Sequence, residues 1–159
     1  MMTKITFILI GLFFSNSIQL PTKTYSEETC IAKADAEKIL GLPAHQTEST
    51  TLSENNVLQH KCSWKATPDD LNSNLYYLDE LHDNAESADK VFDDIVVSNR
   101  NNPGHSRLNI GDEAWFHSDG TNFCFLMVRK GNKIIRMKVN RLTKETSVDE
   151  MKRVATAWQ

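Results

Sequence analysis

The sequence predicts a protein of the α+β class, with helices packed on one side of an antiparallel sheet in the order α-βββ-α-ββββ-α. Two observations predict this class. Segments of strand length follow one another through short turns, which favours antiparallel pairing. Three segments have apolar residues at helical spacing, and they stand before, between and after two runs of strands. Helices that alternated with single strands would instead indicate a parallel sheet. The recurrence of a helix followed by strands also suggests a degenerate duplication of two units.

The chain begins with the features of an export signal. Lys4 precedes the apolar run Ile5–Phe14, and the small residues Ser15 and Ser17 suit cleavage after Ser17. The run is about half of the roughly 20 residues that a membrane-spanning helix needs. A retained membrane anchor is the alternative. We therefore expect a signal peptide over residues 1–17, a loose leader over residues 18–29 and a single α+β domain over residues 30–159.

The first half of the domain reads as one short helix and three strands. Ala34–Leu40 has acidic residues in its first turn and is followed by Gly41, which is a common helix stop. The second strand has the clearest alternation of apolar and polar residues. The three predicted strands are Gln46–Leu52, Leu58–Ala66 and Leu75–Leu81.

The second half repeats this pattern at greater length. Asp83-Asn84-Ala85-Glu86 has the spacing of a capping box, and apolar residues at helical spacing follow it as far as Val96. Asp119-Gly120 and Gly131-Asn132 are hairpin turn signals. The predicted strands are Arg107–Ile110, Glu113–Ser118, Asn122–Lys130 and Lys133–Leu142, and a second capping box, Ser147-Val148-Asp149-Glu150, begins a closing helix.

The three cysteines allow three single-bridge pairings and leave one thiol over. Cys124 lies in the continuous apolar run Phe123–Val128, which is typical of a strand buried on both faces, where a free cysteine acts as a small hydrophobe. We therefore predict a disulfide between Cys30 and Cys62 in an oxidising compartment. A reactive Cys124 is the alternative, although its apolar neighbours offer nothing that would stabilise a thiolate.

Charge and motif content narrow the classes of function. Residues 18–98 hold 15 acidic and 6 basic side chains, whereas residues 99–159 hold 6 acidic and 11 basic ones. The net charge of −3 makes nucleic acid a poor partner. The five histidines lack the short spacing of a zinc site, and the chain has no nucleophile elbow, phosphate loop or dinucleotide fingerprint. We therefore expect no cofactor and no metal, and we assign no catalytic residue. An unmarked hydrolase site would need Ser106 or Ser118 with a distant histidine.

Two features are candidates for a binding surface. Trp115 and Phe116 follow an acidic pair, which would place aromatic surface beside hydrogen-bonding groups, with burial in the core as the alternative. The polar face of the last predicted strand carries Arg136 and Lys138, with Arg129 and Lys130 nearby. This face would dock an anionic surface; the alternative is an edge strand that its charges protect against aggregation.

The chain also resembles a loose group of small exported bacterial domains of unknown function, many of them lipoproteins. The resemblance rests on Cys30 leading into Ala36-Glu37-Lys38-Ile39-Leu40-Gly41, on Cys62-Ser63-Trp64, on Gly111-Asp112-Glu113-Ala114-Trp115-Phe116 and on the hairpin from Val128 to Val139. It implies a helix-plus-antiparallel-sheet domain with a bridge between the first two cysteines, and it supplies no activity. Cys30 follows Glu27-Glu28-Thr29, which is unlike a lipidation site.

These observations predict an exported, non-catalytic envelope domain that binds a macromolecular partner or a small ligand. We expect it in the periplasm or outside the cell, and not spanning a membrane once the signal is removed. The alternative is a periplasmic or secreted enzyme, such as a hydrolase, with an unrecognised site.

Overall fold

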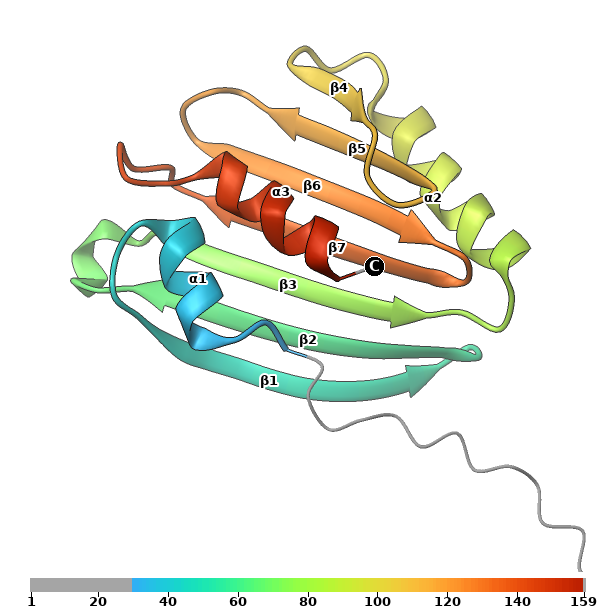
Figure 1. Cartoon of the computed structure of the whole chain (residues 1–159), viewed down its shortest axis with the longest axis horizontal. Helices are drawn as coiled ribbons and strands as arrows, with labels where there is room; N and C mark the ends of the chain where they lie inside the picture. The colour runs from blue at the N-terminus through green and yellow to red at the C-terminus, as the bar shows by residue number, and fades with distance from the viewer. Residues whose placement is uncertain (1–29, 159) are drawn as a thin grey trace, which may run out of the picture.

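Seven strands form one antiparallel sheet in the order β1-β2-β3-β7-β6-β5-β4, and three α-helices pack on it (Figure 1). The computed structural model describes residues 30–158, so the expected signal peptide and leader lie outside the described residues. The α+β class and the element order are confirmed. The elements are α1 (Lys33–Leu40), β1 (Ala44–Glu54), β2 (Val57–Ala66), the 3₁₀ turn η1 (Asp69–Leu71), β3 (Asn74–Leu81), α2 (Ala85–Asn99), β4 (His105–Leu108), β5 (Glu113–Ser118), β6 (Phe123–Lys130), β7 (Lys133–Asn140) and α3 (Val148–Ala157).

The two predicted capping boxes have different outcomes. At α3, Ser147 is the N-cap and its Oγ accepts a hydrogen bond from Glu150 N at 3.2 Å, as predicted. At α2, the N-cap is Asn84, one residue after the Asp83 that the capping-box spacing indicates. Asn84 Oδ1 accepts from Ser87 N at 2.8 Å, and asparagine is as good a cap as aspartate.

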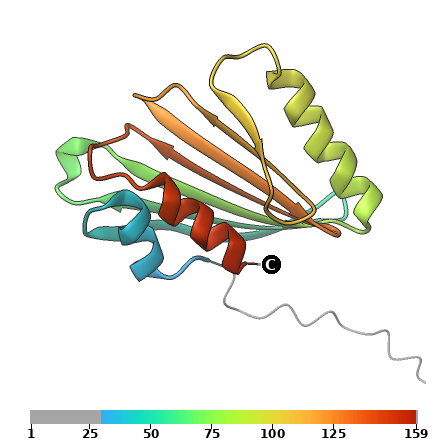
Figure 2. The same cartoon turned by 45° about the horizontal axis from the view of Figure 1, so that its top comes forward.

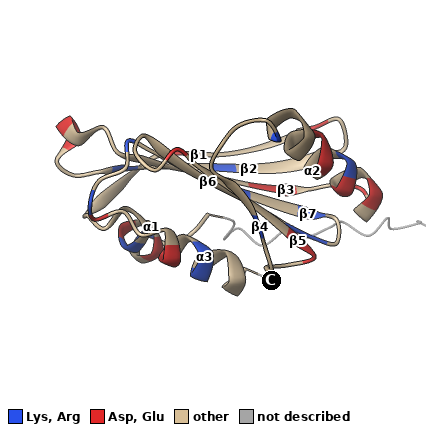
Figure 3. Ribbon diagram, turned by 90° about the horizontal axis from the view of Figure 1, so that it is seen from above, with Lys and Arg blue, Asp and Glu red and all other residues tan. Residues whose placement is uncertain are grey.

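The helices occupy both faces of the sheet, so the expectation that all of them pack on one side is wrong for α2. Figures 1 and 2 show α1 and α3 side by side over one face, and Figure 3 shows α2 on the other. The reason is that the strands of the second half are apolar on both sides. Leu126 and Val128 face the α1–α3 core, whereas Met127 and Ile134 pack with Phe92 of α2. Both layers bury apolar surface, which is the main favourable term in folding.

The two halves of the sheet meet where β3 pairs with β7. Each half is a meander whose last strand lies at this junction, as a duplicated unit would give. A two-fold axis that exchanges two antiparallel neighbours is perpendicular to the sheet, and it would leave α1 and α2 on the same face. Because they lie on opposite faces, the positions of the helices do not follow the symmetry that a duplication of two units would give.

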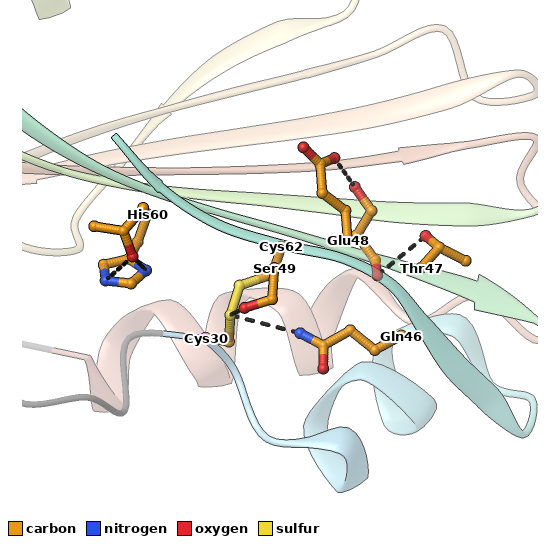
Figure 4. The surroundings of a disulfide bond; sticks show 9 residues. Cys30, Gln46, Thr47, Glu48, Ser49, His60 and Cys62 are labelled. Carbon is orange, nitrogen blue, oxygen red and sulfur yellow. Dashed lines mark hydrogen bonds between the residues drawn. A yellow bond between two sulfur atoms is a disulfide. The ribbon is translucent and has the colours of Figure 1, made fainter. Parts of the chain in front are cut away.

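The predicted disulfide between Cys30 and Cys62 is present, with the two Cα atoms 5.9 Å apart (Figure 4). It joins the segment before α1 to β2, on the face that α1 and α3 cover. Gln46 and Ser49 of β1 lie beside it, whereas Glu48 points to the opposite face. Cys124 is free and buried, and this burial raises the pKa of its thiol to about 11. Cys124 is therefore a thiol at neutral pH, not a reactive thiolate.

Among residues 30–158, no helix combines the length and apolarity that crossing a membrane requires. The disulfide is compatible with an exported protein.

We expect the disulfide to contribute about 3 to 4 kcal/mol to the free energy of unfolding, because it closes a loop of 32 residues in the unfolded chain. Urea unfolding of the oxidised protein and of a Cys30→Ala/Cys62→Ala variant measures this difference. Dithiothreitol should lower the midpoint of the wild type and leave that of the variant unchanged. Equal midpoints for the wild type and the variant would contradict the stabilising role of the bridge.

Candidate functional site

A row of side chains crosses the whole sheet on the face that carries α2. Residues directly opposite each other in neighbouring antiparallel strands point to the same face, so the pairing register places one residue from each strand in this row. From β4 to β1 the row is His105, His117, Phe125, Lys138, Tyr76, Ser63 and Glu48. It brings together residues that are far apart in the sequence.

Helix α2 covers only part of this face. Its side chains reach β5, β6 and β7 through Phe92, which packs with Trp115, Met127 and Ile134. Figure 1 shows α2 at the ends of the strands on the side of β4 to β7, away from β1, and its largest contacts with the sheet are to β6 and β7. Tyr76, in the middle of the row, is accordingly 44% exposed.

Two adjacent pockets lie along the uncovered part of the row. One, of about 600 Å³, lies at the C-terminal end of α2; its lining includes Ile95, Asn99, Trp115, His117, Phe123, Phe125 and Lys138. The other, of about 360 Å³, lies over β2 and β3; its lining includes Glu48, Lys61, Ser63, Tyr76, Leu78, Phe125, Arg136 and Lys138. Phe125 and Lys138 line both pockets, so we treat the two pockets as one groove. The groove is defined by the two sets of lining residues given above.

Two histidines fix the outer wall of the groove. His105 and His117 face each other across β4 and β5, and their Nε2 atoms donate to the carbonyl oxygens of Arg100 at 3.0 Å and Pro103 at 3.1 Å. The ring of Trp115 lies near both, with centroids 6.1 Å from His105 and 5.3 Å from His117. These contacts hold the loop after α2 against the sheet. Within residues 30–158, no group of three metal-ligating side chains is present.

The carboxylates around the groove are largely occupied by partners of their own. Glu80 accepts from Gln59 Nε2 at 3.0 Å and pairs with Arg136 at 2.6 Å. Asp119 accepts from the backbone N–H groups of residues 121–123 and from the Asn122 side chain, and these hydrogen bonds hold its pKa well below the usual range. Glu48 accepts from Ser63 Oγ at 3.1 Å.

Two lysines of the groove have no carboxylate partner among the described residues. Lys138 lies with its Nζ 5.6 Å from the centre of the Phe123 ring, a cation–π distance. Lys61 lies on the same face, opposite Leu78. Neither lysine forms an ion pair within the described part of the chain. Lys61 and Lys138 are therefore the cations of the groove that lack a carboxylate partner in residues 30–158, whereas the carboxylates of Glu48 and Asp119 accept hydrogen bonds from neighbouring groups.

The structure separates the six residues expected to form a binding surface. Trp115, Arg136 and Lys138 line the groove. Phe116 points to the opposite face, where the Nζ of Lys152 lies 5.7 Å from the centre of its ring. Arg129 pairs with Glu113, Asp112 and Asp89, and Lys130 is exposed at the turn between β6 and β7. The edge-strand alternative is wrong, because β7 lies at the centre of the sheet.

Sequence reasoning missed the aromatic floor of the groove. Phe125 and Tyr76 flank Lys138 only because the register pairs β6 and β3 with β7. The alternation of Phe123 and Phe125 in β6 was the available signal, since it predicts two aromatic side chains on one face. No local pattern in the sequence indicates that β3 and β7 pair, which is what places Tyr76 next to Lys138.

Ser118, a serine that an unmarked hydrolase site would use, is part of a turn. Its Oγ donates to the carbonyl oxygen of Phe123 at 2.7 Å and accepts from Gly120 N at 3.0 Å. The neighbouring His117 donates its Nε2 proton to Pro103. The hydroxyl therefore has a structural role in the β5–β6 turn.

A search with protein-family models finds no match to this chain, and a search of curated proteins finds no significant match either. The site is therefore interpreted from its own geometry.

We expect the buried His82 to make folding sensitive to mild acid. It is 3% exposed, and burial lowers its pKa from 6.5; Arg136 lowers it further, against the opposing effect of Glu80 and Asp83. Because the unfolded state takes up the proton first, the stability that the neutral ring contributes is present above pH 6.5 and decreases as the pH falls below it. Urea unfolding at pH 7.5 and 5.5 should show a larger loss for the wild type than for His82→Gln.

His45→Gln, which changes an exposed histidine, is the matched control and should keep the wild-type difference between the two pH values. An equal loss for the wild type and His82→Gln would show that His82 is not the source.

Proposed function

We propose that this protein is an exported, non-catalytic binding domain and that its ligand occupies the groove on the α2 face. The observation that carries the proposal is the pair of adjacent pockets that share Phe125 and Lys138. Their volumes lie in the range of small-molecule sites, about 300 to 1,000 Å³, and their lining has the usual character of aromatic and apolar walls with a few polar groups. Export is supported by the predicted signal peptide and by a disulfide that is compatible with it.

Of the two kinds of ligand expected from the sequence, the groove favours a small molecule over a macromolecule. Protein partners bind mainly to flat surfaces with a large buried area, whereas a small ligand needs a concave site that surrounds it. The basic residues that would have made a flat docking face are dispersed, because Arg129 is neutralised by three carboxylates and Lys130 lies at an exposed turn away from the groove.

The chemistry at the groove also supports binding over catalysis. A general base needs a titratable side chain that is free to take a proton from the substrate. Asp119 is held by four hydrogen bonds in its turn, and Glu80 is held by Arg136 and Gln59. The hydrolase alternative has no comparable observation in its favour.

The neutral fluorescent probe N-phenyl-1-naphthylamine should bind in the groove, with increased emission, and should shift the amide NMR signals of groove residues. Tyr76→Ala removes exposed ring surface from the floor without opening the core, and we expect it to raise the Kd about fivefold. Leu71→Ala, a comparably exposed residue in η1, is the matched control and should leave the Kd unchanged.

Shifts confined to residues of the α1–α3 face would contradict the proposed site. So would a Kd that responds equally to the Tyr76→Ala and Leu71→Ala changes.

A further inference from the structure

We infer that the ligand of the groove is a small carboxylate with an apolar body, bound with its carboxylate at Lys138. The inference rests on the proposed function and adds the chemical class of the ligand. It is drawn from the position of Lys138 in the row of side chains and from the lack of an ion pair at its ammonium group within the described part of the chain.

Lys138 lies between two aromatic side chains in the middle of the row. It is opposite Phe125 on one side and Tyr76 on the other, and it is the one residue besides Phe125 that lines both described pockets. An apolar body seated in either pocket therefore places its polar end near Nζ. The rings of Phe123 and Phe125 and the side chain of Ile95 supply apolar contact on the α2 side.

The unpaired ammonium group of Lys138 favours an anion. A neutral ligand that covered Lys138 would remove water from its ammonium group without giving it a partner, which costs free energy. A cation would meet Lys138 and Lys61, while the carboxylates of Glu80 and Asp119 are held by their own hydrogen bonds. Glu48, which also lines the groove, lies on β1 at the far end of the row, three strands away from Lys138. A ligand anion instead takes the place of the water around an unpaired ammonium group.

The available donors favour a carboxylate over a phosphate. Phosphate sites use several cations or the two-pronged guanidinium of arginine. Arg136, the one arginine in the described lining of the groove, is already held by Glu80 at 2.6 Å. Lys138 is a single compact charge, which suits a monoanion.

Displacement of N-phenyl-1-naphthylamine by octanoate, 1-octanol and octyl phosphate tests the inference, because the three compounds share an unbranched chain of about eight carbons and differ in the polar group. We expect octanoate to displace the probe at about fivefold lower concentration than 1-octanol, and octyl phosphate to be no better than octanoate. Lys138→Met keeps the length of the side chain and removes its charge, so it should abolish the preference for octanoate. Added salt should reduce the preference in the wild type.

Lys130→Met is the matched control, because Lys130 is exposed at a turn outside the groove, and it should keep the preference. Circular dichroism establishes that each variant is folded. Equal displacement by octanoate and 1-octanol, or a preference that survives Lys138→Met, would overturn the carboxylate assignment and leave the groove as a site for neutral ligands. Stronger displacement by octyl phosphate would assign a phosphate instead. Failure of the probe and all three compounds to bind would overturn the proposed function as well.

Discussion

The architecture depends on burying β6 and β7 on both of their faces. Leu126 and Val128 need cover on one side, while Met127 and Ile134 need it on the other. Three helices serve these two faces: α1 and α3 share the first, and α2 is alone on the second. A helix is about 10 Å wide, whereas seven strands at about 4.8 Å span about 29 Å, so α2 leaves most of its face uncovered. The groove is what remains beside it, and its apolar floor is the uncovered continuation of the surface that α2 packs on.

The uncovered half of that face is stable because its outward residues are mostly polar or paired. Strands β2 and β3 direct Trp64, Leu75 and Tyr77 into the core beneath α1 and α3, and they direct Ser63, Gln59 and Glu80 to the open side. The contacts of Gln59 and Arg136 with Glu80 link β2, β3 and β7 across this surface. The disulfide adds a covalent link between the start of the described chain and β2 on the covered face. The open face can therefore hold a binding site without exposing the core.

The local features of this fold were predictable from the sequence, and the pairing of distant segments was not. Helical spacing and the Ser147 cap predicted α3, and turn residues predicted the meander from β5 to β7. Both signals depend on residues that are close together in the sequence. The side that α2 occupies depends on which strands it meets, although the apolar run around Cys124 already implied cover on both faces. At the site, Arg136 and Lys138 were identified from alternation. Arg129 has the same pattern, but Asp89 of α2 and the acidic pair before β5 neutralise it, and Tyr76 becomes a neighbour of Lys138 only through the sheet register.

The placement of β7 between β3 and β6 sets the order in which the domain can be completed. The last strand of the chain forms the junction between the two meanders, so a growing polypeptide contains two unjoined pieces until residues 133–140 are available. Until then β3 and β6 each expose an unpaired edge of backbone N–H and C=O groups, which invites pairing with other chains. A chain that ended before β7 would therefore form two separate, aggregation-prone sheets, and not a shortened version of the native domain.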